Sequence, residues 1–145
     1  MADLSHSIHI DAPREKVWNT MLNDAPYRQW AATFMEGSYY EGDWSEGSKM
    51  LFLGPDAEGG TASGMASMVK ENRPQEFVSL EHVAEVHSGV EVPWKEVGYE
   101  NYTLEDEEGG TKVTVELLNI PDEYEDMFNG MWPEALKKLK EISEK

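Results

Sequence analysis

The first residues of the chain alternate between two faces of an extended stretch. One face carries Leu4, His6, Ile8 and Ile10. Serines and His9 occupy the opposite face. Because successive side chains of a strand point to opposite sides, this period of two predicts a half-buried β-strand.

A helical pattern follows this strand. Pro13 suits the first turn of a helix, since its missing amide proton is not needed there. The apolar residues that recur at helical spacing are Val17, Trp18, Met21 and Leu22. The segment 23–26, Asn-Asp-Ala-Pro, ends this helix and starts a shorter one that ends near Trp30. Two short helices joined by a tight turn are therefore predicted.

Between about Phe34 and Asn119, glycine-rich and proline-rich turns separate runs of β-branched and aromatic residues. Six strands are predicted here, at about residues 36–41, 48–53, 61–71, 76–84, 98–104 and 111–118. In the last of them Val113, Val115 and Leu117 alternate with polar residues, so one face is buried and the other solvated. No helical pattern separates successive strands, which predicts an antiparallel sheet.

The chain ends in a helix predicted from about Asp122 to Glu144. Its apolar stripe consists of Tyr124, Met127, Phe128, Met131, Trp132, Ala135, Leu136, Leu139 and Ile142. Pro133 removes one amide donor and crowds the carbonyl of Asn129, so a kink is expected beside Gly130. The fold class is α+β: a seven-stranded antiparallel sheet wrapped around a long kinked C-terminal helix, with two short helices between the first two strands.

Four spaced segments carry a family resemblance. They are the strand-to-helix segment 8–18, Trp30, the loop 42–47 (Gly-Asp-Trp-Ser-Glu-Gly) and the segment 130–132 (Gly-Met-Trp). Their order over nearly the whole chain resembles the Hsp90-ATPase-activator-homologue-like branch of the START/Bet v 1-like superfamily. The resemblance implies a helix-grip fold around an apolar cavity. It covers only the domain that corresponds to the C-terminal part of the eukaryotic activator.

Composition limits the classes of function. A chain of 145 residues that is 39% hydrophobic has about the size of one domain, and a single domain, 1–145, is expected. The 12 Lys and Arg residues against 29 Asp and Glu residues give a formal charge of -17, which repels nucleic acids and anionic membranes. The absence of cysteine excludes thiol chemistry and disulfides. Without a signal-peptide or membrane-spanning pattern, a cytoplasmic protein is expected.

The predicted cavity would lie between the concave face of the sheet and the terminal helix. The candidates for its wall are Trp30, Phe34, Phe52, Met65, Trp94, Tyr102, Phe128, Met131 and Trp132. Each of these large residues either lines a cavity or fills the core, and the sequence leaves both interpretations open. The eight methionines and five tryptophans favour a cavity, because methionine adapts to variable contents.

Polar candidates for chemistry are few. None of the four histidines is paired with another at the spacing that would place both on one metal ion, so no metal site is predicted. His6 shares the face of Ile8 and could be a polar group at the cavity wall. Glu81 and Glu100 lie inside predicted strands, and either would be a candidate acid or base if it pointed inward. Hydrolase and phosphate-loop motifs are absent, so no catalytic residue and no cofactor are predicted.

Residues 84–97 form a segment longer than a hairpin turn requires. Pro93 argues against a regular central strand, and Trp94 is an expensive residue to leave in water. An ordered loop is therefore expected. In it, Trp94 either closes the mouth of the cavity or packs on the outside of the sheet.

The favoured function is binding of a small hydrophobic or aromatic molecule in the cavity, without catalysis. The wider superfamily implies one alternative, a polyketide cyclase or dehydratase-like enzyme that uses polar groups in the same cavity. The resemblance to Hsp90 ATPase activators implies a second, a protein interaction with a chaperone as partner. Nucleic-acid binding and membrane insertion are not expected.

Overall fold

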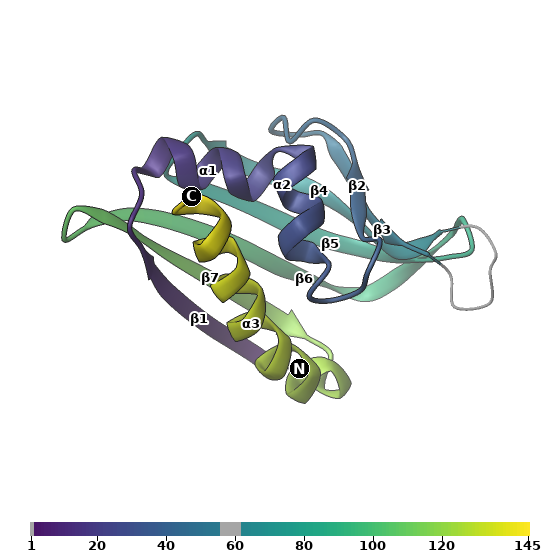
Figure 1. Ribbon diagram of the computed structural model, residues 1–145. Helices are drawn as coiled ribbons and strands as arrows, with labels where there is room; N and C mark the ends of the chain where they lie inside the picture. Colours follow the sequence, from purple (N-terminus) through teal and green to yellow (C-terminus); the bar gives the residue numbers. More distant parts are fainter. Residues whose placement is uncertain (1, 56–61) are drawn as a thin grey trace.

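The computed structural model describes residues 2–55 and 62–145, and within them the elements follow the predicted order (Figure 1). The strands are β1 (Ala2–Ile10), β2 (Tyr39–Glu41), β3 (Lys49–Gly54), β4 (Ser63–Arg73), β5 (Phe77–His87), β6 (Val90–Glu107) and β7 (Gly110–Ile120). The helices are α1 (Arg14–Leu22), α2 (Asp24–Ala31) and α3 (Glu125–Ser143), and η1 (Asp122–Tyr124) is a short 3-10 helix. The predicted strand start at residue 61 lies outside the described residues.

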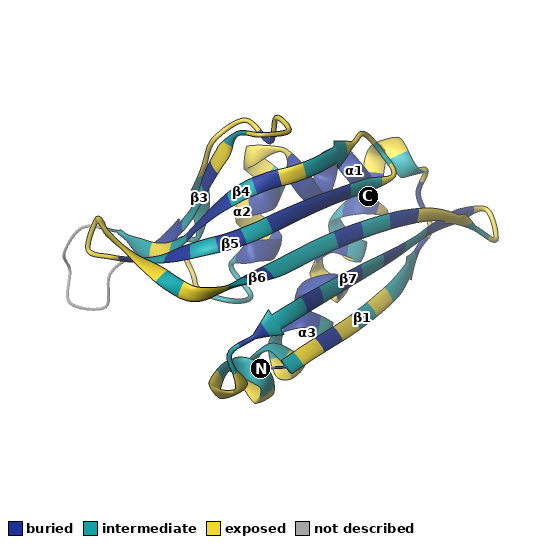
Figure 2. Ribbon diagram, turned by 180° about the vertical axis from the view of Figure 1, so that it is seen from behind, coloured by how far each residue is buried: buried dark blue, intermediate teal, exposed yellow. Residues whose placement is uncertain are grey.

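The strands form one antiparallel sheet with the order β1-β7-β6-β5-β4-β3-β2. All three α-helices lie against the same face of this sheet (Figure 1), which is called the inner face below. Seen from the other side, buried and more exposed residues alternate along the strands (Figure 2). The α+β class and the helix-grip arrangement are therefore confirmed.

Strand register determines which side chains belong to the inner face. Leu80 and Leu117 belong to the main core between sheet and helices, and both pair with Glu100. Directly paired residues share a face of the sheet, so Glu100 points inward. Glu81, the next residue along β5 from Leu80, points outward and forms an ion pair of 3.3 Å with Lys70. The sequence left the orientation of both glutamates open.

Helix α3 closes the inner face with the apolar stripe that the sequence predicted. Trp132, Ala135, Leu136 and Leu139 are buried on it. The helix continues through Pro133, and its first predicted turn is the 3-10 segment η1. The kink beside Gly130 stays a prediction, and no helix in the described part of the chain is long and apolar enough to cross a membrane.

The prediction of an ordered loop at residues 84–97 was wrong. β5 continues to His87, β6 begins at Val90, and the two are joined by a tight turn at Ser88 and Gly89 with φ of 47° and 83°. Pro93 is tolerated in the ladder opposite Ala84, because β7 pairs with β6 only from Tyr99 onward and leaves the other side of Pro93 unoccupied by described residues. This hairpin, residues 84–97, is called the β5–β6 ribbon below.

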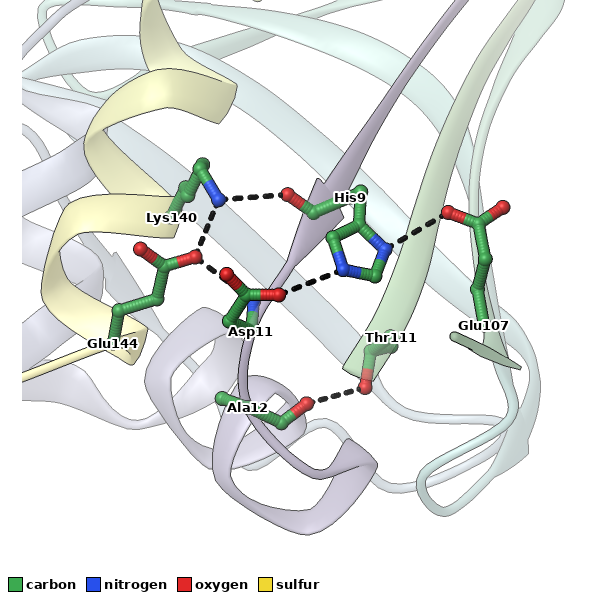
Figure 3. A network of polar contacts seen from close by, with 7 residues as sticks. All are labelled: His9, Asp11, Ala12, Glu107, Thr111, Lys140 and Glu144. Atoms are coloured by element: carbon green, nitrogen blue, oxygen red, sulfur yellow. Dashed lines mark hydrogen bonds and ion pairs between the residues drawn. The ribbon is translucent and has the colours of Figure 1, made fainter. Parts of the chain in front are cut away.

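Polar contacts fix the C-terminal end of α3 to the end of β1 (Figure 3). The His9 ring lies 2.8 Å from an Asp11 oxygen and 2.9 Å from a Glu107 oxygen. Lys140 donates to the His9 carbonyl at 3.1 Å, and Glu144 accepts from both Lys140 and the Asp11 amide. These contacts join three elements that are far apart in the sequence, and they close one end of the inner face.

Candidate functional site

A continuous cluster of aromatic rings lies between the helices and the sheet. The ring centroid of Trp132 lies 4.9 Å from Phe34, 5.9 Å from Tyr102 and 6.1 Å from Trp30. Tyr27 extends the cluster from Trp30, at 5.2 Å. Edge-on and tilted arrangements predominate, which is the geometry that aromatic quadrupoles favour.

The cluster continues from Tyr27 to the strands β2 and β3. Tyr27 lies 5.0 Å from Tyr40 and 6.3 Å from Phe52, and Phe52 lies 5.5 Å from Trp44. The structure thus brings together five of the predicted wall residues: Trp30, Phe34, Phe52, Tyr102 and Trp132. Sequence reasoning missed Tyr27 and Tyr40, which belong to the same cluster.

The predicted wall residues differ in exposure. Trp30, Tyr102 and Trp132 are only 3%, 4% and 3% exposed. The remaining six are half-buried: Phe34, Phe52, Met65, Trp94, Phe128 and Met131. Met65 pairs with Phe52 and Glu85 on the inner face. The inner face therefore has a fully buried part, around Trp30, Tyr102 and Trp132. Beside it lies an apolar surface that the helices cover only in part.

Trp94 reaches the inner face from the β5–β6 ribbon. Its ring packs edge-on against His82 at 6.2 Å, and a Cβ atom on Gly98 would lie 3.2 Å from it. His82 pairs with Gly98 in the ladder, so the glycine leaves room for the indole. The indole therefore lies on the inner face, and closure of a cavity mouth by Trp94 stays a prediction. The indole Nε1–H is buried and has no hydrogen-bond partner among the described residues.

A hydrogen-bonded network crosses three strands of the inner face. Ser67 Oγ lies 2.6 Å from His82 Nδ1, and His82 Nε2 lies 3.3 Å from a Glu100 oxygen. The Tyr102 hydroxyl donates to the other Glu100 oxygen. Ser67 and His82 are 0% and 3% exposed, whereas the Glu100 side chain is 19% exposed. Burial and the nearby Glu100 charge hold the pKa of Tyr102 well above its usual value, so the phenol remains protonated and can donate.

A second carboxylate of the inner face lies under the start of α3. The Tyr124 hydroxyl donates to a Glu85 oxygen at 3.0 Å, and His87 Nε2 lies 2.8 Å from the other oxygen. Burial and this hydrogen bond raise the pKa of Tyr124. His6 also faces α3, where its Nε2 lies 2.9 Å from the Asn129 side-chain oxygen.

The arrangement of possible metal ligands can be stated for the described residues. Within residues 2–55 and 62–145, no group of three or more His, Asp or Glu side chains is placed to hold a metal ion. The histidines described above are instead engaged with serine, asparagine or carboxylate side chains, which suits hydrogen bonding.

Two surface hollows lie away from the aromatic cluster. One, of about 350 Å³, follows the outer side of α1 and α2 at Lys16, Asn19 and Asn23. The other, of about 510 Å³, lies between Arg14 and the turn that joins β6 to β7. Neither includes a predicted wall residue, so lining of a cavity by those nine residues stays a prediction.

The sequence of this chain matches a known protein family. Residues 11–144 match the family model described as Activator of Hsp90 ATPase homolog 1-like protein. The chain belongs to this AHSA1-like family. The match begins in the turn after β1 and ends one residue after α3, so it includes both helices of the N-terminal half, the ring cluster, and the Glu100 and Glu85 networks, but not His6. No curated protein matches the chain.

Solved structures share the fold of this AHSA1-like chain. A protein from Chromobacterium violaceum is 22% identical, with a TM-score of 0.73 over 99% of this chain and 97% of that one. A protein from Nitrosomonas europaea is 16% identical, with a TM-score of 0.76 over 97% and 93%. The Aha1 dimer from Colwellia psychrerythraea is 21% identical, with a TM-score of 0.71 over 99% and 97%. At these identities the likeness shows the fold.

Proposed function

We propose that the inner face of this AHSA1-like domain binds a small hydrophobic or aromatic molecule. The proposed site lies between the Trp132 ring cluster and the hydrogen bond that joins Tyr124 to Glu85. The single observation that supports it best is the set of half-buried apolar side chains on facing elements: Phe34, Phe52, Met65, Phe128 and Met131. A partly covered apolar surface of this kind gains free energy when a ligand removes it from water.

The chemistry of the surface suits a ligand of variable shape. Burial of apolar area contributes roughly 25 cal/mol per Å². Met65 and Met131 are flexible and polarizable, so they adjust to different contents at little cost. Glu100 and His82 supply a polar end that would orient the molecule. Such a combination of apolar walls and a few fixed polar groups is common in small-molecule sites.

A chemical-shift titration tests this proposal. The labelled protein is titrated with flavonoids, fatty acids and sterols, which span shape and polarity. Saturable shifts are expected at Phe128, Met131 and Trp132 and at the strand residues that face them. Met131→Ala should weaken binding of any hit by about three- to tenfold, since it removes contact area. Met127→Ala is the matched control on the same helix, because Met127 is 42% exposed and should leave binding unchanged.

The opposite result has a clear meaning. If no member of the panel shifts these residues, the small-molecule proposal loses its support. Interaction with a protein partner such as a chaperone then becomes the favoured function, and a pull-down at physiological salt is the next experiment.

One observation favours an enzymatic alternative. A cyclase or dehydratase-like activity requires an ionisable group that faces the ligand, and Glu100 points inward with His82 as a partner. For this alternative, Glu100→Gln should abolish conversion of a bound ligand, measured by mass spectrometry, while leaving its affinity nearly unchanged. Equal conversion by both proteins would exclude Glu100 as the acid or base.

A further inference from the structure

Hydrogen bonds hold the side chain of Glu100 on the inner face. The carboxylate lies on the central strand β6 between Leu80 and Leu117, and its protein contacts are the Tyr102 hydroxyl and the His82 ring. A neutral imidazole satisfies both of its own contacts, because Ser67 can donate to Nδ1 and Nε2–H can donate to Glu100. The carboxylate is thus oriented by hydrogen bonds from a phenol and an imidazole.

In the part of the chain that the structure describes, no lysine or arginine compensates the charge of Glu100. Within the described residues, neither Glu100 nor Glu85 forms an ion pair with a lysine or arginine. Lys70 and Lys49 form ion pairs elsewhere, with Glu81 on the other face and with Glu91 on the β5–β6 ribbon. A partly buried carboxylate without a counter-charge is costly, and a cation that joined it would lower this cost.

Two aromatic residues lie close to the same carboxylate, Tyr102 in direct contact and Trp94 beyond His82. The hydroxyl of Tyr102 contacts Glu100 directly, and burial and the charge of Glu100 raise the pKa of Tyr102. Trp94 packs against His82, the other partner of Glu100. The faces of tyrosine and tryptophan rings attract cations, most strongly where water is excluded. A formal charge of -17 also steers cations toward the protein from a distance.

We propose that the ligand of this inner face is a hydrophobic organic cation, an amine or quaternary ammonium. Its charged group would contact the Glu100 carboxylate and the rings of Tyr102 and Trp94. Its apolar part would lie along Phe128 and Met131. The inference rests on the proposed function, since it needs the inner face to admit a small molecule. It further specifies that this molecule carries a positive charge.

Two probes of equal shape test the charge directly. Benzyltrimethylammonium and neopentylbenzene differ only in having a positive nitrogen or a neutral carbon at the branching atom. Both are titrated into the labelled protein at 150 mM salt. The cation is expected to bind the wild-type protein at least about tenfold more tightly than its neutral isostere, with shifts centred on His82, Glu100 and Tyr102.

Two variants separate the inner face from the acidic surface. Glu100→Gln keeps the shape and should reduce the preference for the cation by about tenfold, while affinity for neopentylbenzene changes less than about twofold. Glu81→Gln is the matched control, because Glu81 lies one strand away on the opposite face and its loss changes the net charge by the same amount. It should leave the preference intact.

The possible failures are distinguishable. If the wild-type protein binds both probes equally, the inner face is a ligand site and the cation inference is wrong. If cation binding persists in Glu100→Gln but disappears at high salt, the cation binds the acidic surface, which also overturns the inference. If neither probe nor any member of the titration panel binds, both the inference and the proposed function fail.

Discussion

The two ends of the inner face belong to the same sheet and are both covered by α3, yet their side chains are packed differently. At the end near the C-terminus of α3, Ile10, Val17, Val113 and Leu139 are completely or almost completely buried. The contacts of His9, Lys140 and Glu144 close this end (Figure 3). At the other end, Phe52, Met65 and Phe128 are half-buried and lie beside inward carboxylates. The comparison indicates that one end supplies stability and leaves the other free to carry a site.

The largest expected difference is in stability, between Leu139→Ala and Met131→Ala. Both residues lie on α3, but Leu139 is 1% exposed and Met131 is half-buried. Leu139→Ala should lower the free energy of unfolding by about 2–5 kcal/mol, since it removes contacts and leaves a cavity. Met131→Ala should cost no more than about 1 kcal/mol. Urea unfolding measures both values, and equal losses would show that the two ends are packed alike.

An intermediate effect is expected from the buried network. Ser67→Ala leaves His82 Nδ1 without its partner at a position with no access to water. It should lower the free energy of unfolding by about 1–3 kcal/mol. Ser38→Ala is the matched control, because its hydroxyl also makes a 2.6 Å hydrogen bond but is exposed. The control should stay within about 0.5 kcal/mol of wild type, and a Ser67 variant equally close to wild type would mean that the network adds no stability.

The smallest effect concerns pH at the closed end. Hydrogen bonds that the His9 ring donates to the carboxylates of Asp11 and Glu107 raise the pKa of His9 above 6.5. Protonated His9 therefore stabilises the folded state fully below about pH 6.5, and this contribution is lost as the pH rises through the folded pKa. An NMR titration of the His9 ring should give a midpoint above 6.5.

The matched variant is His9→Gln. Unfolding curves for this variant should lack the part of the pH dependence that wild type shows above neutrality. A His9 midpoint at or below the ordinary value would contradict the contacts with both carboxylates.

Much of the fold could be predicted because its signals are local. Alternation in β1 and β7 and the helical spacing of α3 depend on neighbouring residues only, and these elements were correctly predicted. Five wall residues met in one ring cluster, since apolar residues on inward faces have few other places to pack. The same alternation could have placed His82 inward, because it continues the series of Val78 and Leu80 on β5.

The network and the β5–β6 ribbon depend on register, which local patterns do not contain. Ser67, His82 and Glu100 stand on three strands, and irregularities between Ala66 and Ser67 and between His82 and Ala84 set their alignment. Pro93 was taken to exclude a strand because a central strand needs amide donors on both sides. Whether a second neighbour exists depends on where β7 ends, which is a property of the whole sheet.

The β5–β6 ribbon also bears on how molecules of this protein meet one another. From Val90 to Glu96, β6 has a backbone edge that no described strand covers. Exposed strand edges invite other chains to add a strand and so to aggregate. Here Pro93 offers no amide proton, residues 94–97 bulge out of register, and charged Lys95 and Glu96 flank the edge. An added strand would lose hydrogen bonds and bury charge, so the ribbon protects its own edge against aggregation.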